Sequence, residues 1–203
     1  MINEKDITYD EIFEHTFKVV SSERFLNKQG IGNEVPFFIV PFKPEDALKI
    51  EEDVNNLIKK LNTEKGIEII NLNLYKICIE MLKDNDVFDN ILENEASIPK
   101  DDLLDALQSM LDPETNLIPK IKEIIKDKQF NVAFITGVGE VYPYIRSHNV
   151  LNNLQSTIEE QPTVMFFPGK YSFSETKGSS LDLFNIMPGD RYYRAFNLLK
   201  QQI

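Results

Sequence analysis

One stretch of the sequence combines a glycine turn with side chains that could do chemistry: "AFITGVGEVYPYIRSH", Ala133 to His148. Its order predicts a buried strand, a glycine turn and then the start of a helix. In parallel sheets, ligands bind beyond the carboxyl ends of strands, where the N-terminal N–H groups of helices attract anions. Gly137, Gly139 and Glu140 occupy that position.

The spacing around these glycines argues against a phosphate site. A dinucleotide fingerprint needs a third glycine, but that position is Tyr142. A P-loop needs a lysine, and no lysine lies between Lys128 and Lys170. Glu140 would also place a carboxylate beside any phosphate and oppose the ~0.3 to 1 kcal/mol that a helix terminus offers an anion. We therefore expect a structural corner, and keep a weak nucleotide-binding hydrolase that uses Glu140 and His148 as the alternative.

The sequence offers few other candidates for catalysis. His148 shares a helical face with Tyr144 and Leu151, which favours a packed histidine, and His15 lies far away in the sequence. The single cysteine, Cys78, has apolar neighbours that favour burial. No metal-binding or nucleophile motif is present in the sequence. We expect no catalytic residue, no metal and no cofactor, and hence a protein that is not an enzyme.

A second group of residues suits recognition of a partner. Arginine and tyrosine are over-represented among interface hot spots. The chain places both near its C-terminal end and after the glycine turn; the possible partner-binding residues are Arg146, Arg191, Tyr192, Tyr193 and Arg194. The alternative is that they serve edge-strand packing and surface salt bridges.

The elements that must position these residues alternate along the chain. Four apolar runs predict buried strands, and helical patterns lie between them, the first near 6–20 and the second from Pro44. Strands this apolar are covered on both faces and belong to a mostly parallel sheet. The predicted fold is a three-layer α/β domain over 1–203, Rossmann-like or P-loop-like but without the phosphate-binding lysine. The four predicted strands are 35–41, 66–74, 130–138 and 162–169.

Two segments depart from this alternation. Residues 75–128 carry helical patterns only, which predicts a helical insertion or acidic lobe within the domain. Asp84 to Glu114 holds ten carboxylates against Lys100 alone, typical of a solvated face or of a docking surface for a basic partner. At the C-terminal end, "LDLFNI" and "RYYRAFNLL" flank "MPGD", which predicts an antiparallel edge hairpin, with a helix as the alternative. Residues 169–180 are expected to form a polar loop.

Composition limits the compartment and the partners. The chain of 203 residues has a net charge of -11 and contains no run of 18 apolar residues. Its start, "MINEKDITYDEIFEH", has charges where a secretion signal needs an apolar stretch. We therefore expect a cytoplasmic protein with no membrane contact. The negative charge argues against direct nucleic-acid binding, which depends on Lys and Arg displacing counterions, although the neutral C-terminal third keeps an accessory nucleic-acid-binding role open as a third hypothesis.

Several phrases resemble a known family. "GIGNEVPFFIVPF", "FITGVGEVYPYIRSHNVLNNLQ", "PTVMFFPGKYS" and "YYRAFNL" together resemble the BrxB family, small core components of BREX bacteriophage-exclusion systems. The likeness runs from about residue 25 to 198 and is weakest over 83–128. Positions that match the family phrases include Gly137, Gly139, Glu140, Arg146, His148, Asn149, Tyr193 and Arg194.

The resemblance implies a role in phage defence beside larger proteins. It implies a PglZ-type protein of the alkaline-phosphatase superfamily, a DNA methyltransferase and a large ATPase as companions, and no established catalytic residue. We therefore expect a non-catalytic interaction module that docks onto the PglZ-type partner.

Overall fold

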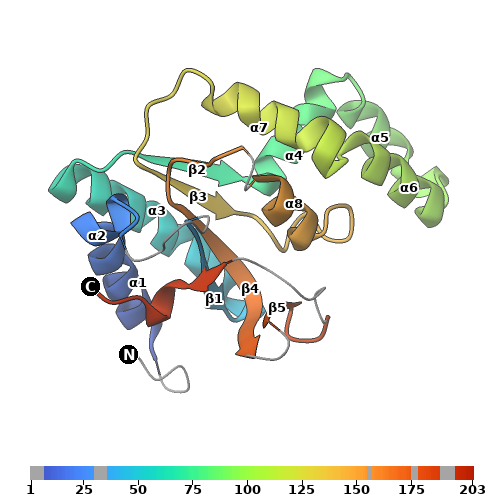
Figure 1. Cartoon of the computed structure of the whole chain (residues 1–203). Coiled ribbons are helices and arrows are strands. Elements are labelled where there is room, and N and C mark those ends of the chain that lie inside the picture. Colours follow the sequence, from blue (N-terminus) through green and yellow to red (C-terminus); the bar gives the residue numbers. More distant parts are fainter. Residues whose placement is uncertain (1–6, 30–35, 155–156, 175–177, 188–194) are drawn as a thin grey trace.

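The computed structural model describes residues 7–29, 36–154, 157–174, 178–187 and 195–203 as a three-layer α/β protein (Figure 1). Its sheet has six strands in the order β2-β3-β4-β1-β6, with β5 paired to β4. All pairs are parallel except β4 with β5. This confirms the predicted fold class. The strands are β1 (Phe37–Phe42), β2 (Ile69–Asn73), β3 (Val132–Thr136), β4 (Thr163–Ser174), β5 (Gly178–Leu183) and β6 (Phe196–Asn197).

The central strands are buried because helices cover both faces of the sheet. All five residues of β3 are buried. Successive residues of β1 face opposite sides, so that Phe37 and Ile39 belong to one core cluster and Phe38 and Val40 to the other. This two-sided burial explains why the strands read as continuous apolar runs.

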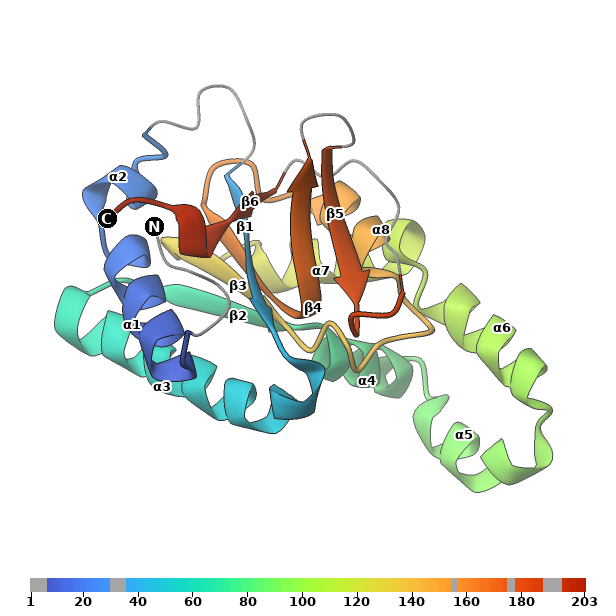
Figure 2. The ribbon, with the colours of Figure 1, turned by 90° about the horizontal axis from the view of Figure 1, so that it is seen from below.

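The helices divide between the two faces (Figures 1 and 2). One core cluster joins the sheet to α1 (Tyr9–Val20), α2 (Glu23–Leu26) and α3 (Ala47–Lys65). The other joins it to α4 (Leu74–Asp84), α7 (Ile118–Ile125) and α8 (Ser147–Leu154).

Local signals set the ends of these helices. Thr8 and Glu11 form a capping box at the start of α1, and α3 follows a 3-10 turn, η1 (Pro44–Asp46). Gly66 ends α3 in the left-handed conformation, with φ of 63°.

The segment between β2 and β3 is helical and partly leaves the body of the protein. After α4 come α5 (Phe88–Asn94), η2 (Glu95–Ser97), α6 (Lys100–Met110) and the π-helical turn η3 (Pro113–Leu117). Figure 2 shows α5 and α6 extending away from the sheet. Leu107 is the buried residue of α6, and α5 has none. Of the ten carboxylates between Asp84 and Glu114, all but the half-buried Asp112 are exposed.

The C-terminal region differs from the sequence-based expectation. The antiparallel hairpin is formed by β4 and β5, so the expected polar loop at 169–180 is largely paired strand. "LDLFNI" ends β5 and then turns at Phe184 and Asn185, which have positive φ. From "RYYRAFNLL", residues 191–194 lie outside the described residues, whereas Phe196 and Asn197 pair in parallel with β1.

The misassigned loop has a physical reason. In this hairpin Leu181 and Leu183 are buried while Ser172 is exposed and Asp182 half-buried. A strand that is buried on one face alternates polar with apolar residues, so it contains as many polar side chains as a loop does.

Across the described residues, no helix is long and apolar enough to cross a membrane.

Candidate functional site

The glycine turn after β3 does not lead directly into a helix. Residues 137–146 form a series of turns, and α8 begins only at Ser147. The predicted order of strand, glycine turn and start of a helix is present, but the helix begins later than directly after the glycines. Because α8 begins only at Ser147, Gly137 and Gly139 do not lie in its first turn.

Gly137 is required by both conformation and space. Its φ is 71°, a region that L side chains rarely adopt. A Cβ atom at this position would lie 2.7 Å from Oδ1 of Asn73 and 3.0 Å from the backbone nitrogen of Tyr75. The glycine therefore allows the end of β3 to approach the first turn of α4.

Gly139 is required by space alone. A Cβ atom here would lie 2.9 Å from Cγ of Pro168 and 3.0 Å from Cε1 of Phe184. The glycine lets the turn pack against Pro168, in the middle of β4, and against Phe184, the residue after β5. Both glycines of the G-x-G therefore have packing reasons that need no bound phosphate.

A pocket opens where the chain changes direction between the two faces of the sheet. β1 leads into α3 on one face, whereas β2 and β3 lead into α4 and α8 on the other. In open α/β sheets such a switch point is the usual place for a ligand. The pocket, here called the strand-end pocket, has a volume of about 220 Å³. Its apolar wall includes Phe42, Ile50, Phe166, Pro168 and Phe184.

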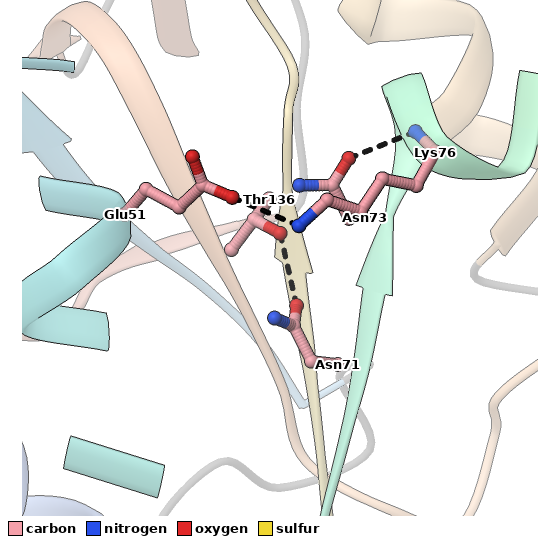
Figure 3. Close-up of polar contacts among 5 residues, drawn as sticks. All are labelled: Glu51, Asn71, Asn73, Lys76 and Thr136. Carbon is pink, nitrogen blue, oxygen red and sulfur yellow. Dashed lines mark hydrogen bonds and ion pairs between the residues drawn. The ribbon is translucent and has the colours of Figure 1, made fainter. Parts of the chain in front are cut away.

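Polar side chains from the ends of two adjacent strands line the strand-end pocket, and Figure 3 draws them. Asn73 and Thr136 are register partners at the ends of β2 and β3, and they are only 8% and 7% exposed. Oδ1 of Asn73 caps α4 by accepting a hydrogen bond from the backbone nitrogen of Lys76 at 3.0 Å. The Thr136 hydroxyl donates to Oδ1 of Asn71 at 2.9 Å.

An ion pair crosses the rim of the same pocket. Nζ of Lys76, in the first turn of α4, lies 2.9 Å from Oε1 of Glu51 on α3 (Figure 3). The search for a lysine near the glycine turn covered only the segment between Lys128 and Lys170 and found none. Lys76 was missed because it follows β2, a different strand that ends at the same edge of the sheet. Its position just after a predicted strand is the signal that could have identified it.

Glu140 lines the strand-end pocket, and the pKa of its carboxyl is raised. Partial burial raises the pKa of its carboxyl, the neighbouring Glu51 carboxylate raises it further, and the Lys76 ammonium opposes both. The carboxylates of Glu140 and Glu51 and the ammonium group of Lys76 therefore lie near one another, whereas the sequence analysis had identified only Glu140.

The other sequence-predicted site residues are not brought to this pocket. Arg146 is exposed on the loop before α8, and Asn149 is exposed on α8, where its carbonyl accepts a hydrogen bond from Asn153. His148 lies on α8, but its side chain is outside what the structure describes. The four residues Arg191, Tyr192, Tyr193 and Arg194 also fall outside the described ranges.

The remaining reactive residues have structural surroundings. Cys78 is buried, and burial raises the pKa of its thiol to about 12. His15 lies with Nε2 3.3 Å from the carbonyl oxygen of Leu198, and burial lowers the pKa of its ring. Within the described ranges, no group of three or more His, Cys, Asp or Glu residues could hold a metal ion.

The fold and the pocket define a doubly wound α/β protein with a small pocket at its switch point, and comparison with known proteins gives the family. The family model for BREX protein BrxB matches residues 70–198. BREX protein BrxB of Bacillus cereus (strain H3081.97) is 32% identical over 181 residues, which cover 89% of this chain and 92% of the relative. BREX protein BrxB of Escherichia coli O9:H4 (strain HS) is 29% identical over 184 residues, covering 89% of this chain and 86% of that protein.

The chain therefore belongs to the BrxB family of BREX proteins. No solved structure matches it. The resemblance read from the sequence phrases is confirmed.

Proposed function

We propose that this BREX component acts as a non-catalytic interaction module that docks onto a PglZ-type protein of the alkaline-phosphatase superfamily. The observation that carries the proposal is the similarity to BREX proteins along almost the whole chain, because a component of a multi-protein defence system works through its partners. The packing roles of Gly137 and Gly139 support it, since they account for the glycine turn without catalysis. The methyltransferase and the large ATPase are further candidate partners.

The docking surface includes the loop before α8. Arg146 is exposed there, and a guanidinium that can pair in a planar, bidentate manner suits an interface anchor. The exposed acidic helices α5 and α6 offer a second face for a basic partner.

Gel filtration of the chain with a PglZ-type protein from the same organism tests the proposal. We expect one complex at micromolar concentrations, and an at least tenfold weaker complex for Arg146→Glu. Arg24→Glu is the matched control, because Arg24 is also exposed but lies on α2. Separate elution of the two wild-type proteins would contradict the proposal.

One observation favours a second candidate, a weak hydrolase at the strand-end pocket. Desolvation raises the pKa of Glu140 at this pocket, and active sites are among the places where such shifts cluster. Titration calorimetry with ATP and GTP in magnesium, followed by a phosphate-release assay on Glu140→Gln, separates the two functions.

A further inference from the structure

The strand-end pocket is lined by a buried asparagine whose amide donor reaches the pocket and has no acceptor among the described residues. Asn73 is 8% exposed, and its Oδ1 is held by the backbone nitrogen of Lys76. That bond fixes the orientation of the amide, because a flipped Asn73 would direct N–H groups at an N–H group. Nδ2 therefore points toward the side of the pocket that holds Glu51 (Figure 3). Among the residues that the structure describes, Nδ2 donates to none.

Acceptors lie near this donor. The Thr136 hydroxyl uses its hydrogen on Asn71, so its oxygen offers only lone pairs to the pocket. Oε1 of Glu51 is occupied by Lys76, which leaves Oε2 able to accept from a ligand. A matching ligand therefore needs an acceptor for Asn73 next to a donor for Thr136 or Glu51.

The size and walls of the pocket restrict the ligand further. A volume of about 220 Å³ lies below the range of roughly 300 to 1,000 Å³ that holds drug-sized molecules, which suits one ring system. Phe42, Phe166 and Phe184 line it, and aromatic rings pack well against a flat heterocycle. Glu51 and Glu140 at the rim oppose a phosphate group.

We propose that the strand-end pocket binds a flat heterocycle that carries an amino group beside a ring-nitrogen acceptor, as the base of adenosine does. Asn73 Nδ2 donates to the ring nitrogen, and the amino group donates to Thr136 Oγ1 or Glu51 Oε2. The base is held by its edge, and no phosphate contact contributes. The inference concerns a ligand site and is independent of docking onto a PglZ-type protein.

Adenosine and inosine form a matched pair of probes. They have nearly the same shape, but inosine carries a carbonyl and a ring N–H where adenosine carries an amino group and a ring acceptor, so the pattern is reversed. In NMR titrations of the full chain, we expect adenosine to bind with a Kd of roughly 0.1 to 1 mM, as small ligands do. Inosine is expected to bind at least about tenfold more weakly, because a polar site rejects a ligand that leaves its groups unpaired.

Asn73→Asp removes the amide donor of the pocket without removing the helix cap. Aspartate caps helices as well as asparagine does, but it presents an acceptor in place of Nδ2. We expect this variant to lose adenosine binding without gaining inosine, because the carbonyl of inosine would still face the acceptors Thr136 Oγ1 and Glu51 Oε2. Thr136→Val is the second variant, and it should weaken adenosine binding at least about fivefold. If Asn73→Asp does not fold, this variant tests the inference. Absence of adenosine binding at millimolar concentration, equal binding of the two nucleosides, or shifts confined to residues outside the pocket would overturn the inference.

Discussion

Lys76 and Glu51 join helices on opposite faces of the sheet: Nζ of Lys76 on α4 lies 2.9 Å from Oε1 of Glu51 on α3. The pair bridges the carboxyl edge of the sheet, above the ends of β2 and β3. It also lies beside Glu140, so that three charged groups from three separate segments share one rim.

Replacement of Lys76 tests the electrostatics of this rim. The side chains of Lys76 and Glu51 are 69% and 43% exposed, so breaking the pair with Lys76→Met should change the free energy of unfolding by less than about 1 kcal/mol. The pKa of Glu140 should nevertheless rise further, because the ammonium group lowers it now. NMR titration of the Glu140 carboxyl measures this shift. Lys122→Met, on α7, should leave the titration unchanged.

Substitution of Gly137 tests whether the glycine turn is fixed by packing. Gly137→Ala should destabilise the protein by about 2 to 4 kcal/mol, because it combines backbone strain with a contact too close to Asn73. Gly66→Ala is the control, since Gly66 has a similar φ of 63° but nothing within 4 Å of its added Cβ. It should cost only about 1 kcal/mol. Equal costs in urea unfolding would mean that the contact with Asn73 does not matter.

Truncation of Leu107 tests how the projecting helices are attached. Leu107 is 6% exposed and packs in the core cluster that contains α4 and α7, so Leu107→Ala should cost about 2 kcal/mol or more. Hydrogen exchange should rise first in α5 and α6. Leu92→Ala should change stability by no more than about 0.5 kcal/mol, because Leu92 is 59% exposed. Unchanged protection of α6 in Leu107→Ala would show that other contacts hold this segment.

Cys78 should be inert in the folded protein. Its thiol is buried, and burial raises its pKa to about 12, so the reactive thiolate is scarce at pH 8. A thiol reagent such as DTNB should react on the timescale of unfolding and at once in denaturant. Rapid labelling of the native chain would contradict the buried position on α4.

The hydroxyl of Tyr9 links the start of α1 to the turn that precedes α3. It donates to Oδ2 of Asp46 at 2.6 Å and accepts from the backbone nitrogen of Lys43 at 3.2 Å. Tyr9→Phe should therefore cost about 1 kcal/mol at neutral pH.

The pH dependence of this contribution follows from the Tyr9 pKa. Burial and the bond to Asp46 raise it to about 12, above the ordinary value of roughly 10. The contribution of Tyr9 should be complete below pH 10 and should disappear as the pH rises from 10 to 12. Ultraviolet titration of tyrosine ionisation, compared between the wild type and Tyr9→Phe, identifies the late-titrating group.

Burial on both faces made the core strands readable from sequence. The runs around Phe38, Phe134 and Phe166 are uninterrupted because each strand has helices above and below it, and all three residues are at most 2% exposed. The polar hairpin of β4 and β5 lacks that double cover, so its strands gave no comparable signal. Parallel pairing of the short β6 with β1 also escaped prediction, because strand order depends on contacts between distant segments.

The candidate site could be predicted only in part. Gly137, Gly139 and Glu140 were found because they follow an apolar strand directly. Lys76 and Glu51 were not identified. Each lies on a helix, and the spacing of residues in the sequence does not show that these two helices meet at one edge of the sheet. Asn73 looked like a strand residue, although the pattern of an asparagine before a helical run is a cap signal that could have identified it.

The strand order has a consequence for how the chain matures. β1 is the earliest strand, yet both of its neighbours, β4 and β6, come from the last fifth of the sequence. While the polypeptide emerges from the ribosome, β2 and β3 can pair with each other, but β1 must wait with both of its backbone edges unpaired. Nascent chains of this protein therefore have an aggregation-prone N-terminal segment until synthesis is nearly finished.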